Sequence, residues 1–179
     1  MLSTNRTKDV IWKQIHLNFY TQYSYNKWHK TQEVCPLCQK VPENIYHLII
    51  NCIFVNKLWE EIEPLLKQLH PIAITEEEKA FGIVQKKETT GIILRNWLTF
   101  LLRECITQEE RTAYHTKKNS NVENTKKKFN QTLSLEIHIK SIRYRNENNL
   151  EFWEKLITHG EVICKKDEDG EYEIRQVFN

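Results

Sequence analysis

Glycine and proline are scarce in this chain, since each occurs only four times in 179 residues. Because both residues interrupt helices, their scarcity favours a mainly helical fold. Long apolar runs are missing too: the longest, Gly91 to Leu102, contains Arg95 and Asn96 and is shorter than the roughly 20 residues that span a bilayer. We therefore expect no membrane partner. Residues 1–13 lack the apolar run of a signal peptide, which predicts an intracellular, reducing compartment such as the nucleus or cytoplasm.

The common catalytic motifs are also missing. The chain has no paired aspartates, no glycine-rich phosphate loop and no Gly-x-Ser-x-Gly sequence. The acidic run from Asp167 to Asp169 does not fit a calcium loop, because Lys165 occupies the first ligand position, and it fits a hairpin turn better. We therefore expect neither an enzyme nor a small-molecule substrate.

One short segment is rich in metal-ligand residues. Its ligands are Cys35, Cys38, His47 and Cys52, spread over 18 residues. A Cys-x2-Cys pair followed by a histidine and a further cysteine can complete the closed tetrahedron of a structural Zn²⁺ site. Such a site leaves no open position for a catalytic water. The spacing predicts one structural zinc ion.

These cysteines could also have roles that need no metal. They could be ordinary buried thiols, because free cysteine is among the most buried residue types. Disulfides cannot account for all of them, because the chain has five cysteines, the remaining two being Cys105 and Cys164. Cys105 lies on an apolar stripe, which places it in the core. His29, six residues before the first ligand, could compete for the metal.

Helical periodicity surrounds the predicted zinc site. Trp12, Ile15, Phe19 and Tyr23 repeat every three or four residues, so a helix over residues 8–30 is expected to bury aromatic side chains, including Trp28. Tyr25 and Trp28 could alternatively stack on bases.

The repeat of apolar residues from Ile45 to Leu69 requires a break in the helix. His47 and Cys52 are five residues apart, about 140° around a regular helix, and could not share one metal there. We expect a helix that ends at Asn51 in the left-handed conformation, and a second helix from about Phe54 that presents Trp59 to the core. Pro64 is expected to kink or restart this second helix.

The remainder is also predicted to be helical, with a hairpin at the end. Expected helices begin at the capping box of Thr75 and cover 92–118, 126–145 and 149–158, and expected strands are 162–166 and 172–177. The predicted fold class is mainly α, with a zinc knuckle inserted between amphipathic helices and a small C-terminal β-hairpin, at the margin of α+β. The predicted segments are 1–72, 73–118 and 119–179.

The small net charge of +2 hides an asymmetry. Residues 111–145 contain nine basic and two acidic residues, whereas residues 146–179 contain nine acidic and four basic ones. A basic stretch of this kind favours a polyanion such as RNA or DNA, although a solvated helix face would also account for it. The predicted contacts are Lys27, Lys30, Lys117, Lys118, Lys126, Lys127, Lys128, Arg143 and Arg145.

The motif itself resembles a known family. The sequence Cys35-Pro-Leu-Cys38, then His47-Leu-Ile-Ile-Asn-Cys52 and Lys57-Leu-Trp59, is similar to the zinc-binding region downstream of the reverse transcriptase in non-LTR (LINE-type) retrotransposons. The resemblance covers about residues 10–70. It implies that the two cysteines of the first pair, His47 and Cys52 bind zinc, and that the region binds element RNA or target DNA. Because the polymerase motif is missing, the chain would be a fragment or truncated copy of a polyprotein, without polymerase activity.

The sequence thus predicts a zinc-stabilised nucleic-acid-binding module of such a polyprotein. Zn²⁺ with three thiolates carries a net charge of −1, so cations around the site must attract the phosphates. The alternative is a zinc-stabilised protein-interaction scaffold that binds the rest of the polyprotein. Salt separates the two, because polyanion binding weakens steeply with salt.

Overall fold

The computed structural model describes residues 5–16, 21–29, 34–87, 89–170, 172–175 and 177–178. Its helical elements are α1 (Asn5–Ile15), α2 (Gln22–His29), the π-helical turn η1 (His47–Asn51), α3 (Ile53–Leu69), α4 (Glu76–Phe81), α5 (Thr90–Thr116), α6 (Val122–Asn146), α7 (Leu150–Ile157) and the 3-10 turn η2 (His159–Glu161). Strands β1 (Cys164–Lys166) and β2 (Tyr172–Ile174) form an antiparallel hairpin. The predicted fold class, mainly α with a metal-ligand cluster between helices and a small C-terminal hairpin, is confirmed.

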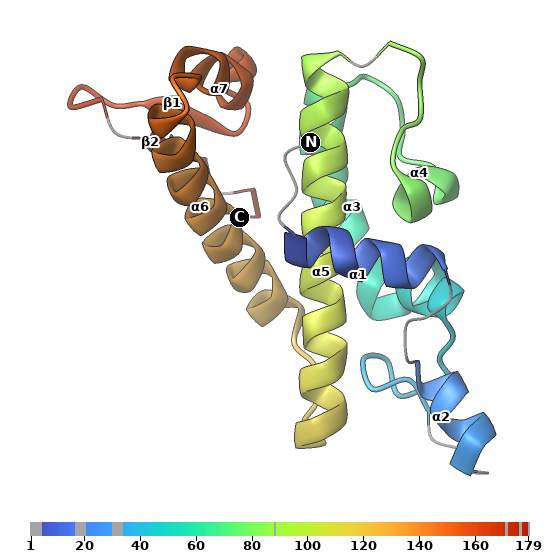
Figure 1. Cartoon of the computed structure of the whole chain (residues 1–179). Coiled ribbons are helices and arrows are strands. Elements are labelled where there is room, and N and C mark those ends of the chain that lie inside the picture. The colour runs from blue at the N-terminus through green and yellow to red at the C-terminus, as the bar shows by residue number, and fades with distance from the viewer. Residues whose placement is uncertain are drawn as a thin grey trace.

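The long helix α5 is the centre of the fold. Figure 1 shows α5 with α6 on one side, and α7 and the hairpin gathered at the C-terminal end of α6. Helices α1 and α3 also pack on α5. Trp59, Trp97, Phe129 and Trp153 are fully buried, and the rings of Trp97 and Trp153 meet edge to face at 6.1 Å. Large aromatic side chains from α3, α5, α6 and α7 thus share one core with many aliphatic side chains, and the burial of this apolar surface stabilises the fold.

Arg95, which interrupts the longest apolar run, is fully buried in α5. Its guanidinium donates to both carboxylate oxygens of Glu78, at 2.5 and 2.7 Å. It also donates to the carbonyls of Leu66 (3.1 Å), Ile72 (2.8 Å) and His70. These bonds satisfy the end of α3 and join it to α4 and α5. A buried arginine is stable only with such partners, and no local sequence pattern indicated them.

The N-terminal prediction was wrong in two respects. Residues 8–30 do not form one helix, because Thr21 between α1 and α2 is not helical. Trp12 and Trp28 are 53% and 76% exposed, so neither is a core residue. Val10 and Ile11 are buried in α1 instead. The predicted positions Phe19 and Tyr20, and the side chains of Tyr23 and Tyr25, lie outside the described residues.

Helix α3 is not restarted at Pro64, which lies inside the single helix Ile53–Leu69. Proline has no N–H for the carbonyl four residues earlier. The buried residues Ile62, Leu66 and Leu69, on both sides of Pro64, hold the helix on the core. Helix α5 begins and ends close to the expected positions, with Thr89 as its N-cap and Lys117 in the left-handed conformation at its C-cap.

None of the helices in the described part of the chain combines the length and the apolar character that crossing a membrane requires. The division into segments 1–72, 73–118 and 119–179 stays a prediction.

Candidate metal centre

The four predicted ligands lie together in space. One ligand atom each from Cys35, Cys38, His47 and Cys52 falls within 4.8 Å of every other. Tetrahedral zinc with Zn–S bonds of about 2.3 Å holds its sulfur atoms about 3.8 Å apart, and Cys38 Sγ lies 3.4 Å from His47 Nε2. The cluster therefore fits one Zn²⁺ with a closed Cys3His donor set. Among the residues that the structure describes, which include His29, the cluster consists of these four ligands, and His29 does not belong to it.

Backbone hydrogen bonds shape the loop that carries the first two ligands. The N–H of Cys35 donates to the carbonyl of Val41, and the N–H of Gln39 donates to the carbonyl of Cys35, both at 2.8 Å. Gln39 takes the left-handed conformation, with φ of 55°. Asn44 Oδ1 accepts from the N–H of His47 at 2.8 Å and so caps the turn that follows. The role of Asn44 was missed, although an asparagine directly before an apolar helical repeat, which here begins at Ile45, is an N-cap signal.

A π-helical turn solves the spacing of His47 and Cys52. The N–H of Cys52 donates to the carbonyl of His47 at 2.8 Å, which is the five-residue bond that defines a π-helix. One such turn brings residues five apart onto the same side, as a shared metal requires. The predicted end of the helix at Asn51 is confirmed, and so is the new helix beyond Cys52.

The predicted left-handed conformation of Asn51 is wrong. Asn51 belongs to the π-helical turn, and it is not among the described residues with positive φ. Cys52 makes the break instead, in an extended conformation with φ of −67° and ψ of 126°. The break leaves the carbonyl of Ile49 available, and the buried Trp59 indole donates to it at 2.8 Å. Trp59 thus holds α3 against the turn.

The electrostatics of the site favour a thiolate at Cys52. A hydrogen bond from Cys35 lowers the pKa of Cys52 to about 4, and the backbone amides of Val55 and Phe54 act in the same direction. Cys52 is the N-cap of α3, where the amides of the first turn point at it. The Cys35 pKa is raised by its hydrogen bond to Cys52, by burial and by Glu43. Glu43 Oε2 lies 3.4 Å from Cys35 Sγ.

The predicted nucleic-acid contacts do not form one surface. Lys127 and Arg145, both exposed, are 18 residues apart on α6, which is about 27 Å along a helix. Lys126 is 7% exposed and its ammonium pairs with Glu61 at 2.6 Å and Glu123 at 3.0 Å. Lys126 therefore holds α6 to α3, and these two ion pairs already occupy the ammonium that was predicted to contact phosphate.

The other predicted basic residues differ in their surroundings. Arg143 pairs with Glu147 at 2.8 Å. Lys128 is partly buried, whereas Lys27, Lys117 and Lys118 are exposed. Lys30 lies outside the described residues.

The zinc loop (residues 35–41) touches the basic linker (residues 117–121) between α5 and α6. Gln39 Nε2 donates to Asn119 Oδ1 at 2.7 Å across 80 residues of sequence. This contact brings the loop, with the exposed Lys40, next to the exposed Lys117 and Lys118. Sequence reasoning missed Lys40, because only the tertiary structure places it beside the linker.

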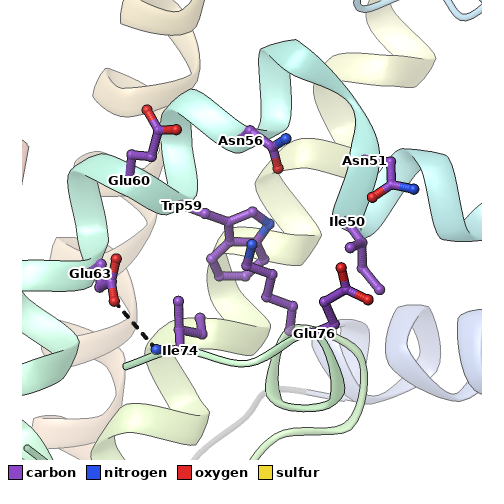
Figure 2. Close-up of a pocket in the computed structure, with 9 residues that line it drawn as sticks. Ile50, Asn51, Asn56, Trp59, Glu60, Glu63, Ile74 and Glu76 are labelled. Atoms are coloured by element: carbon purple, nitrogen blue, oxygen red, sulfur yellow. Dashed lines mark hydrogen bonds between the residues drawn. The ribbon is translucent and has the colours of Figure 1, made fainter. Parts of the chain in front are cut away.

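Residues of the π-helical turn also line an acidic pocket of about 300 Å³. Figure 2 shows Glu60, Glu63 and Glu76 around the ring of Trp59. Lys67 lowers the pKa of Glu63, so this carboxylate stays ionised at neutral pH. Three carboxylates against the single ammonium of Lys79 make this pocket unsuitable for phosphate.

Comparison with known families agrees with the geometry. Residues 3–59 match the family model described as zinc-binding in reverse transcriptase, and this range contains all four ligands. No curated protein and no solved structure matches the chain. The resemblance to a zinc-binding region of the reverse-transcriptase type is confirmed, and with it the expectation of one structural Zn²⁺.

Proposed function

We propose that this chain binds RNA or DNA through the surface where the zinc loop meets the α5–α6 linker. Its residues 3–59 form a zinc-binding region of the reverse-transcriptase type. The observation that carries the proposal is the hydrogen bond from Gln39 to Asn119. It brings lysines from two distant parts of the sequence to one place. The region is not a catalytic domain by itself, and it would act as part of a polyprotein that carries the polymerase elsewhere.

The charges of this surface suit a polyanion. Lys40, Lys117 and Lys118 are exposed around the contact, and Lys27 lies in the last turn of α2, shortly before the loop. Glu43, three residues after Lys40, is buried, and the exposed Glu123, five residues after Lys118, pairs with Lys126. Phosphate binding by such lysines releases counterions and is therefore sensitive to salt.

Zinc acts here through the shape of the loop. When bound, it joins the Cys-x2-Cys loop to the turn of His47 and Cys52, so the loop keeps the position in which Gln39 reaches Asn119. The residues of the chain then make the contacts, because the metal centre with three thiolates is itself anionic. RNA and DNA both offer the phosphates, and the exposed Trp28 ring adds a face on which a base of a single strand could stack.

The test uses two matched pairs of neighbouring lysines. Lys117 and Lys118 lie just after the C-terminal end of α5, whereas the exposed Lys86 and Lys87 precede its N-terminal end, about 40 Å away along a 27-residue helix. Each pair is changed to glutamine in the zinc-loaded chain. Binding to labelled single-stranded RNA, single-stranded DNA and duplex DNA is then measured by fluorescence anisotropy over a salt series.

Lys117→Gln with Lys118→Gln should weaken binding and reduce the salt slope by up to about two contacts. Lys86→Gln with Lys87→Gln should leave both unchanged. Glutamine tolerates the left-handed backbone of residue 117 about as well as lysine does, so folding is preserved. Equal losses from both pairs would mean diffuse charge attraction without a site. Absence of binding to every nucleic acid at low salt would refute the proposal and favour the protein-interaction scaffold.

A further inference from the structure

Helix α6 has two apolar stripes on opposite sides. The buried stripe contains Phe129, Leu133 and Ile137, and it packs on the core with α5 and α3. The second stripe contains Leu135, Ile139 and Ile142, at steps of four and three residues. At about 100° per residue the centres of the two stripes are roughly 160° apart. Leu135, Ile139 and Ile142 are 57%, 54% and 49% exposed, so this stripe faces away from the core.

Basic residues border the exposed stripe. Lys127, His138 and Arg145 fall within about 20° of one another along one edge, and Arg143, which pairs with Glu147 at 2.8 Å, lies on the other edge. The only acids of α6 are Glu123 and Glu136. Glu136 is buried and paired with Lys140, and Glu123 pairs with Lys126. The stripe is therefore an apolar surface with a positive border. Figure 1 shows α6 at the edge of the helical layer, with α5 on one side.

We propose that this face of α6 docks an acidic amphipathic helix of a partner protein. An apolar stripe with steps of three and four matches the ridge of a second helix. Carboxylates beside the partner's apolar ridge would meet Lys127 and Arg145, which gives the charge complementarity that selects partners. This proposal concerns a different surface from the zinc loop and does not depend on nucleic-acid binding.

Other occupants suit the surface less well. A second copy of α6 in antiparallel pairing would bring its own basic border against this one, and like charges repel. Phosphates would meet the cations but gain nothing from leucine and isoleucine side chains. A membrane surface would find only three apolar residues within two turns, whereas interfacial helices bury a longer apolar face.

The test uses the zinc-loaded full chain and a designed helical peptide as probe. The peptide carries leucine at positions a and d and glutamate at e and g, and a second peptide has lysine in place of each glutamate. Affinities are measured by calorimetry. The acidic peptide should bind at least tenfold more tightly than the basic peptide. Ile139→Ser should weaken its binding at least tenfold, and Lys127→Glu with Arg145→Glu should do the same.

Val84→Ser is the matched control, because Val84 is 86% exposed but lies in the loop before α5, outside α6. It should leave the affinity unchanged, and circular dichroism should show all variants folded. Equal affinity for both peptides, or an unchanged affinity in Ile139→Ser, would overturn the proposal. Dimers in sedimentation that Ile139→Ser abolishes, or binding to phosphatidylserine vesicles without binding to the acidic peptide, would overturn it in favour of a second copy or a membrane surface.

Discussion

Removal of zinc should unfold more than the loop that carries the ligands. Cys35 and Cys52 are fully buried and belong to the main hydrophobic core, together with Val55, Leu58 and Trp59 of α3. Trp59 in turn donates to the carbonyl of Ile49 in the π-helical turn. Loss of the metal therefore releases the turn, the first half of α3 and the packing of α3 on α5.

The magnitude follows from general values. A structural zinc ion contributes roughly 10 to 16 kcal/mol of apparent binding free energy in small fingers, whereas a whole domain has a net stability of about 5 to 15 kcal/mol. Because these two free energies are of similar size, the segment 34–62 should unfold without metal. The end of the chain has packing of its own, in which Tyr144 stacks on Trp153 with ring centroids at 5.2 Å, so α6, α7 and the hairpin should keep part of their protection.

Hydrogen exchange with mass spectrometry, before and after chelation, measures this directly. Amides of 53–62 should lose protection first and those of 129–157 should lose less. Cys38→Ser should reproduce the pattern, because it removes a ligand, while Cys164→Ser should bind one zinc ion as before. Cys164 is the matched control, since it is buried outside the cluster and donates to the carbonyl of Ile157. Unchanged protection of 53–62 in zinc-free protein would refute the reasoning.

Three further predictions concern single side chains. Asn51→Gly should destabilise the zinc-loaded protein by about 1 kcal/mol more than Asn51→Ala in thermal unfolding, because Asn51 is helical and glycine is the poorer helix former. A glycine variant more stable than the alanine variant would instead indicate that Asn51 is left-handed. Arg95→Met should cost about 3 to 5 kcal/mol in urea unfolding, because the buried Glu78 carboxylate and three carbonyls lose their donor; a loss below about 1 kcal/mol would show that this ion pair adds little. Burial, with Glu43 nearby, raises the pKa of Glu110 to about 8, so the folded protein keeps a proton that the unfolded chain has already lost, and stability falls as pH rises from about 4.5 to 8. Glu110→Gln should therefore be more stable than the natural protein by about 1 to 3 kcal/mol at about pH 8.5 and equal to it near pH 4; equal stability at both pH values would contradict the raised pKa.

The sequence determined the zinc ligands and the order of the helices, because both depend on local spacing. The Cys-x2-Cys pair closes its own small loop, and the apolar repeat from Val55 to Leu69 predicts a helix whichever part of the core it packs against. Because His47 and Cys52 lie about 140° apart on a regular helix, the sequence also required a break between them. It could not choose a π-helical turn over a left-handed residue, since both satisfy the metal and only the core position of Trp59 favours the former.

Tertiary structure alone decided which charged and aromatic residues face solvent. Lys126 and Lys127 are neighbours in sequence, yet only Lys126 points at Glu61 of α3 and becomes buried. Trp12 and Trp28 belong to an aromatic repeat that predicts burial, but α1 packs through Val10 and Ile11 instead. Lys40 and Lys117 are 77 residues apart and share one surface only because Gln39 reaches Asn119. Local periodicity fixes which side of a helix is apolar, whereas the partner that covers this side is set by packing between distant segments.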